Sequence, residues 1–255
     1  MESAGTLFGA FYGELVPYPW HDPEHDAYQL FHQRSLAMGW LDRLWGMNDA
    51  GWEHPAGASG TGLVSWFQVE AGTVAGDRPL PVRPFLACAG DAVARTGRAD
   101  LTAVQLLLPV QGIDPATRPA YASVPSLMAV EWFGERDPGA RTPVTVALSS
   151  GSRELHVVEE RLAGLKQDVF VHRSSSSPHG TALPDGIPAP PFDDTFWDGP
   201  ARHHALLRGE LAEWSCDAVG WLGEVVADCA ALGGLRVPLL VSVVRDRDRD
   251  RDRDH

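Results

Sequence analysis

The sequence predicts an α+β fold, in which helices pack on one face of a mostly antiparallel sheet. The strongest support comes from residues 203–244, which predict a strand, a helix and a second strand in that order. Ser215 and the pair Gly233-Gly234 stand where an N-cap and a helix end are expected, and apolar residues between them recur every three or four positions. Asp217, Glu224 and Asp228 take the other side, so we expect an amphipathic helix with one buried stripe.

A second β-α-β series precedes this one and gives the C-terminal half a ferredoxin-like (split β-α-β) order. It consists of a strand at 144–148, a helix over roughly 153–166 and a strand at 168–172. Residues 127–133 predict another strand, which forms a hairpin with 144–148. A doubly wound α/β sheet is the alternative, but the hairpin and the lack of a Gly-rich nucleotide turn after the first strand disfavour it.

The N-terminal half predicts a looser version of the same plan. Residues 7–16 predict an aromatic-rich strand, which a proline-broken turn at 17–20 follows. A capping Asp22 and then Pro23 predict a helix start, and apolar spacing carries this helix to about residue 45. Residues 46–62 are rich in Gly, Ala and Ser and predict a loop. The remaining elements of this half are predicted as a strand at 63–69, a short helix at 85–95 and a strand at 101–110.

The order of elements divides the 255 residues into two lobes. We expect an N-terminal α+β lobe over 1–111 and a C-terminal ferredoxin-like lobe over 112–244, either separate or joined in one continuous domain. Residues 173–202 show no periodicity, and a loop of this length often carries function. Residues 245–255 alternate Arg and Asp and predict a disordered tail.

Composition limits the class of partner and the compartment. The net charge is −13, and an acidic surface disfavours both nucleic acid and anionic membranes. No apolar run approaches the roughly twenty residues of a membrane helix, and the N-terminus lacks the basic region of a signal peptide. The three cysteines are too few to predict a disulfide framework. The sequence therefore predicts a cytoplasmic protein.

Residues 21–25 suggest a metal site. His21, Glu24 and His25 match the H-x-x-E-H spacing, which on a helix can bring two imidazoles to one zinc ion. His21, however, precedes the Asp22 cap, so the two imidazoles do not share a helical face. The alternative is that Asp22 caps the helix, Glu24 favours its positive end and the histidines are exposed.

The end of the long loop suggests a catalytic site. Asp194 and His204 provide a carboxylate and an imidazole for acid–base chemistry or for binding a divalent ion. Folding of this loop over the 17–25 turn would unite them with His25, and would place Trp20 and Trp197 in the same pocket. The alternative is a solvated acidic loop that Trp197 anchors to the body of the protein.

Residues 149–153 suggest an anion site between a buried strand and a helix. Ser150, Ser152 and Arg153 supply hydroxyls and a guanidinium beside the N–H groups of a helix start. Ser152 explains the same stretch as a simple N-cap. No G-x-S-x-G motif supports a serine nucleophile.

Two functions from different classes fit these features. The favoured one is a recognition protein that binds a protein partner or a small ligand, because Trp20, Trp52 and Trp197 are typical interface anchors and no catalytic motif is complete. The alternative is a small-molecule tailoring enzyme with a His/Asp loop site, with or without a metal. The sequence identifies no cofactor and no oligomeric state.

Overall fold

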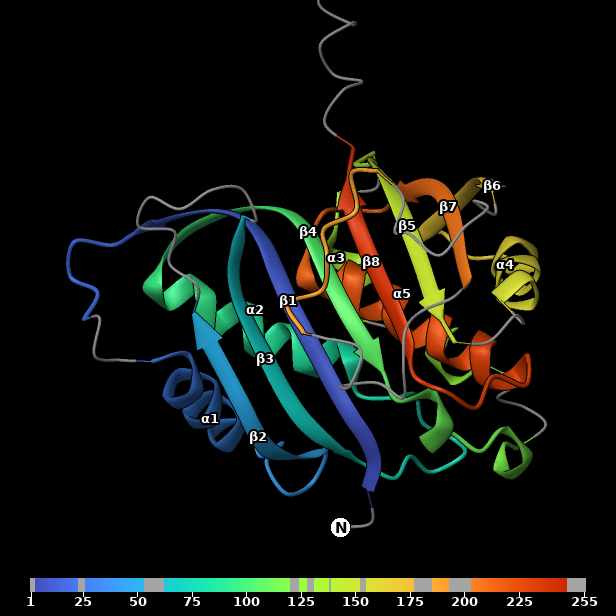
Figure 1. The fold of residues 1–255 in the computed structure, drawn as a ribbon, viewed down its shortest axis with the longest axis horizontal. Helices are drawn as coiled ribbons and strands as arrows, with labels where there is room; N and C mark the ends of the chain where they lie inside the picture. Colours follow the sequence, from blue (N-terminus) through green and yellow to red (C-terminus); the bar gives the residue numbers. More distant parts are fainter. Residues whose placement is uncertain are drawn as a thin grey trace, which may run out of the picture.

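A sheet of eight strands forms the frame of the molecule (Figure 1). The computed structural model describes residues 3–22, 26–52, 62–119, 124–127, 131–137, 139–151, 155–176, 185–192 and 203–246. The strands are β1 (Ser3–Pro17), β2 (Trp45–Trp52), β3 (Leu63–Gly72), β4 (Gly97–Leu108), β5 (Thr142–Ser150), β6 (Phe170–Ser176), β7 (His203–Leu211) and β8 (Leu239–Arg245). The helices are α1 (Ala27–Ala37), α2 (Val82–Thr96), α3 (Glu131–Glu135), α4 (Leu155–Gly164) and α5 (Cys216–Leu232).

The two halves of the chain follow the same order of elements. The first is β1-α1-β2-β3-α2-β4 and the second, after the connection over 109–141, is β5-α4-β6-β7-α5-β8. In the sheet the strands lie in the order β2-β3-β1-β4-β8-β5-β7-β6, so equivalent strands occupy equivalent places. The last strands of the halves, β4 and β8, pair antiparallel with Leu106 opposite Val241, which makes the sheet continuous.

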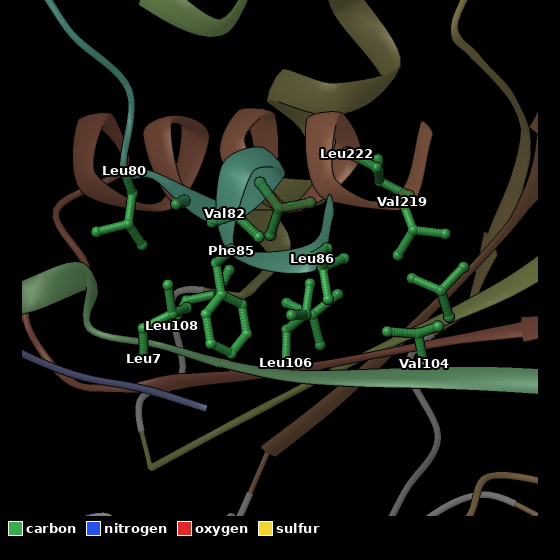
Figure 2. Close-up of a cluster of buried hydrophobic side chains, with 14 of the residues drawn as sticks. Leu7, Leu80, Val82, Phe85, Leu86, Val104, Leu106, Leu108, Val219 and Leu222 are labelled. Carbon is green, nitrogen blue, oxygen red and sulfur yellow. The ribbon is translucent and has the colours of Figure 1, made fainter. Parts of the chain in front are cut away.

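All the longer helices pack on the same face of this sheet. Side chains from β1, β4 and β8 form one buried cluster with side chains from α1, α2, α4 and α5. Figure 2 shows its centre, where Leu106 and Leu108 of the sheet point toward Phe85 of α2. Burying a Leu or Phe side chain stabilises a fold by about 1.5–3 kcal/mol, so this cluster holds the helix layer on the sheet. The predicted α+β class, with a mostly antiparallel sheet and helices on one face, is confirmed.

Helix α5 has the predicted ends but not the predicted single buried stripe. The Ser215 hydroxyl accepts a hydrogen bond from the Ala218 N–H at 3.1 Å, and Gly233 is the C-cap. Glu224 and Asp228, however, are only 3% and 0% exposed. The 3-10 turns at 110–112, 115–117 and 125–127 contact α5, and residues on both sides of this helix are buried.

The predicted hairpin of 127–133 with 144–148 is wrong. Pro125–Leu127 forms a 3-10 turn, and Glu131–Glu135 is the short helix α3. The reason is the pairing of β5, whose two edges are occupied by β7 and β8 and offer no place for a third strand. The doubly wound alternative is also wrong, because every pair of neighbouring strands in the sheet is antiparallel.

The first helix is shorter than predicted. Helix α1 begins after Asp26, whose carboxylate accepts from the Gln29 N–H at 2.7 Å, and it ends at Ala37. Gly39 then adopts a φ of +65°, a conformation typical of the residue that ends a helix. The apolar residues after Gly39 lead into β2, so residues 45–52, predicted as helix end and loop, are strand.

The chain leaves the sheet slightly later than predicted. Arg245, assigned to the tail from the sequence, pairs with Val144 at the end of β8. The Asp246 N–H also donates to the Pro143 carbonyl at 3.0 Å. Residues 247–255 lie outside the described ranges. Among the helices that the structure describes, none is long and apolar enough to cross a membrane.

Candidate functional site

Of the residues predicted to bind metal, the structure describes only His21. His21 lies ahead of α1, in a turn where its N–H donates to the Tyr18 carbonyl at 3.0 Å. Glu24 and His25 lie outside the described residues, as do Ser152, Arg153, Asp194 and Trp197. Within the described ranges, no three His, Cys, Asp or Glu side chains are grouped so that they could hold a metal ion.

Trp20 is an exposed aromatic side chain. It is 71% exposed and stacks on Tyr18, with ring centroids 4.8 Å apart and an interplanar angle of 12°. Beside it is a groove of about 320 Å³, which is lined by Trp20, His21, Asp22, Leu30, Gln33 and Arg95. An exposed tryptophan of this kind can anchor a protein partner.

His204 lies on the sheet face opposite the helices, where it meets a serine. It is 6% exposed, and its Nδ1 is 2.8 Å from the Oγ of Ser149, its direct neighbour on β5. Ser149 is 1% exposed. Ser150, named in the predicted anion site, is also buried, but alternation along β5 turns its side chain to the helix face.

The structure separates His204 from Trp20 and His21. Trp20 follows the end of β1, where Pro17 pairs with Gly97 at the start of β4. His204 is level with Leu107, near the other end of β4. Strands β1 and β7 are also four positions apart in the sheet, about 19 Å at about 4.8 Å per strand. One pocket therefore cannot contain Trp20, His21 and His204.

A diagonal stripe of polar side chains crosses the face opposite the helices. Its members come from five neighbouring strands, and all are nearly or fully buried: Tyr12, Gln105, Ser242, Ser149 and His204. The Tyr12 hydroxyl is 2.8 Å from Gln105 Oε1, and Gln105 Nε2 donates to Ser242 Oγ at 3.1 Å. Polar groups in such a position are costly unless they are hydrogen-bonded, so this stripe fixes the side chains that it contains.

The ladder of β1 and β4 has a bulge beside Tyr12, where Thr102 is the extra residue on β4. The register of β1 against β4 shifts between Tyr12 and Gly13. Gly13 has a φ of +150°, and a Cβ there would lie 2.2 Å from the Asp100 carbonyl oxygen, so only glycine fits. Tyr12 itself faces the stripe by normal alternation along β1, as Phe8 and Ala10 do.

The segment over 185–192 covers part of this face, and we call it the strap. It lies in front of the sheet near β1 and β4 (Figure 1). Its Pro188 carbonyl accepts from Gln105 Nε2 at 2.5 Å, and its Ala189 carbonyl lies 3.0 Å from the Tyr12 hydroxyl. At its far end, Phe192 meets Phe8 edge to face with ring centroids 5.0 Å apart.

Between the strap and the sheet is a cavity of about 760 Å³. Its walls come from β1, from the adjoining ends of β4 and β8, and from the strap itself. The lining residues are Tyr12, Gly13, Glu14, Gly62, Thr102, Ala103, Gly186, Ile187, Pro188, Ala189 and Val244. The lining is mainly apolar or glycine, with two hydroxyls and one carboxylate among its side chains.

The buried carboxylates of α5 belong to the helix layer, on the other side of the sheet. Asp228 forms an ion pair with Arg118 and accepts from the Ser126 hydroxyl at 2.9 Å. Burial raises the pKa of Glu224 to about 7, and its carboxylate accepts one bond from the Arg83 N–H at 3.0 Å. These contacts attach α5 to the segments that cover it, so we regard both residues as structural.

The sequence contained a signal for the stripe that periodicity alone does not reveal. Gln105 and Ser242 each interrupt a strand that is otherwise apolar, at 103–108 and 239–244. A polar side chain inside a covered strand requires a hydrogen-bond partner, which marks both residues as members of a buried network.

Comparison of the chain with protein-family models, curated proteins and solved structures gave no match.

Proposed function

We propose that this protein is a recognition protein that binds a small, largely apolar ligand between the strap and the sheet. The observation that carries the proposal is the cavity of about 760 Å³ bounded by Tyr12, Val244 and the strap. Sites for small ligands are typically of about 300–1,000 Å³, with a mainly hydrophobic lining and a few polar groups that orient the ligand. The Tyr12 and Thr102 hydroxyls and the Glu14 carboxylate are the orienting groups here.

The attachment of the strap suits a site that admits a ligand. Hydrogen bonds to the strap involve its main-chain carbonyls at Pro188 and Ala189. Both donors, Tyr12 and Gln105, are fixed on the sheet. Segments held by few contacts open at low free-energy cost, so the strap can lift without unfolding the sheet.

We also propose that each half of the chain is a ferredoxin-like unit and that the lobes over 1–111 and 112–244 are joined in one domain. The support is the repeated β-α-β-β-α-β order and the equivalent places of the strands in the sheet. The cavity then lies beside the junction of β4 and β8, and ligand sites often form where two such units meet.

A second candidate function is an enzyme, and one contact favours it. The Ser149 hydroxyl lies 2.8 Å from His204 Nδ1, within reach for activation of a serine nucleophile. Because Ser149 is buried and does not line the cavity, we prefer recognition. Labelling of the wild-type protein, but not of Ser149→Ala, by a fluorophosphonate would favour the enzyme instead.

The proposed site can be tested with the neutral, apolar fluorophore N-phenyl-1-naphthylamine. We expect its fluorescence to rise on binding to the wild-type protein. Ala189 is an exposed residue of the strap and lines the cavity. Ala189→Trp therefore places an indole in the cavity and should weaken binding at least about tenfold. Ala75→Trp, at an exposed alanine outside the cavity, is the matched control and should bind like wild type. Absence of binding, or equal binding by both variants, would exclude this site.

A further inference from the structure

We infer that the ligand carries a positive charge, as an amine attached to an apolar body. This inference rests on the proposed function and specifies the chemistry of the same cavity. Among the described residues that line the cavity, Glu14 has the one charged side chain. These lining residues include no Lys, Arg or His that could bind an anion. A carboxylate or phosphate ligand would therefore meet a negative charge and no compensating cation.

The hydroxyls of the cavity also favour a ligand that only donates hydrogen bonds. The Tyr12 hydroxyl donates to two acceptors, Gln105 Oε1 at 2.8 Å and the Ala189 carbonyl at 3.0 Å. The Thr102 hydroxyl likewise donates to the Tyr12 carbonyl at 3.3 Å. Toward a ligand, both hydroxyl oxygens and the Glu14 carboxylate act as acceptors. An ammonium group, with three donors and no acceptor, matches this set.

A third observation is a pair of opposed carboxylates at the strand pair beside the cavity. Glu14 of β1 lies directly opposite Asp100 of β4, and like charges at opposite positions of an antiparallel pair destabilise it. The Arg245 Nη1 atom lies 3.9 Å from Asp100 Oδ1, so Asp100 has a basic partner. No basic side chain in the described ranges forms an ion pair with Glu14. A bound cation at Glu14 would relieve this repulsion. The net charge of −13 adds a general attraction for cations.

The test compares three ligands that share one apolar chain and differ in the head group. Decylamine, decanol and decanoate, each below its micelle concentration, compete with N-phenyl-1-naphthylamine for the wild-type protein. We expect decylamine to bind most tightly and decanoate least tightly. Glu14→Gln should reduce the advantage of decylamine over decanol by roughly two- to fivefold, the effect of an exposed ion pair. Glu70→Gln removes an exposed glutamate of β3 outside the cavity and should preserve that advantage.

Each outcome of this competition experiment supports or overturns either the inference or the proposed function. Decanoate binding as tightly as decylamine, or an unchanged amine-to-alcohol ratio in Glu14→Gln, overturns the inference while the proposed function stands. Failure of N-phenyl-1-naphthylamine and all three ligands to bind removes the proposed function and the inference with it. Added salt should weaken decylamine more than decanol, because it screens the charge of Glu14.

Discussion

Glu224 shows how one residue makes the stability of this protein depend on pH. It lies on α5, where its side chain is buried against the start of α2. Unlike Asp228, which pairs with Arg118, it accepts a single main-chain hydrogen bond, from Arg83. Burial therefore raises its pKa from the ordinary value of 4.5 to about 7, and the neighbouring Asp228 and Asp217 add to the rise.

The sign of the effect follows from proton binding. Between pH 4.5 and about 7 the folded protein holds the Glu224 proton and the unfolded chain does not. The stability contributed by this proton is complete below pH 4.5 and is lost as the pH rises through about 7. Glu224→Gln keeps a neutral side chain at every pH. Relative to wild type, we expect it to raise the free energy of unfolding at pH 8 by on the order of 2–3 kcal/mol, with little gain near pH 4.5.

Urea denaturation at both pH values would measure this difference. Glu70→Gln, on the exposed surface of β3, is the control and should show no pH-dependent gain. An equal effect of Glu224→Gln at pH 4.5 and pH 8 would contradict the assignment of the raised pKa to this carboxyl group.

At the scale of the element, the strap depends on side chains that belong to the sheet. Its carbonyls at Pro188 and Ala189 meet Gln105 and Tyr12, and Phe192 packs on Phe8. Alternation along β1 places Tyr12 on the face that the strap covers, together with Phe8 and Ala10. The position of the strap is thus set by distant residues and not by a structure of its own.

Tyr12→Phe tests this dependence. The substitution keeps the buried ring but removes the only hydrogen that reaches Gln105 Oε1 and the Ala189 carbonyl from this side chain. We expect a loss of about 1–2 kcal/mol in the free energy of unfolding and faster hydrogen exchange of amides in 185–192. Hydrogen exchange followed by mass spectrometry would resolve the strap. Tyr28→Phe, on the exposed side of α1, should leave strap exchange unchanged, and an unchanged rate in Tyr12→Phe would show that this hydroxyl does not hold the strap.

At the scale of the whole molecule, the two halves share a sheet and a core. Val241 of β8 is fully buried and lies between Leu106 of the first half and Leu148 of the second. The helices α2 and α5, one from each half, also pack against each other. Unfolding of either half would expose the core of the other, so we expect the chain to unfold in one transition.

Val241→Ala tests this cooperativity. Removal of two methyl groups from the shared core should lower the free energy of unfolding by about 2 kcal/mol. The urea transitions followed by tryptophan fluorescence and by far-ultraviolet circular dichroism should coincide and shift together. Val16→Ala, at a side chain that is 65% exposed, should change the free energy by less than about 0.5 kcal/mol. Two separate transitions, with one unmoved by Val241→Ala, would mean that the halves are energetically independent.

Sequence reasoning succeeded where the signal is local and failed where it is not. The cap at Ser215 and the glycine at 233 fixed α5, because capping involves groups within one helical turn. Apolar spacing alone extended α1 through Gly39 to residue 45, because the same residues can pack from a helix or from an edge strand. The hairpin at 127–133 failed because the partners of β5 come from later in the chain.

The sequence by itself determined the α+β class, the ends of α5 and most of the strands, since these depend on neighbours in the chain. Only the tertiary structure decided that Asp228 is buried, that His204 meets Ser149 instead of Trp20, and that a cavity lies under the strap. Tyr12 and Gln105 are 93 positions apart in the sequence, and Gln105 and Ser242 are 137 apart. Such contacts exist only once the sheet has formed, because strand pairing sets which polar side chains face one another.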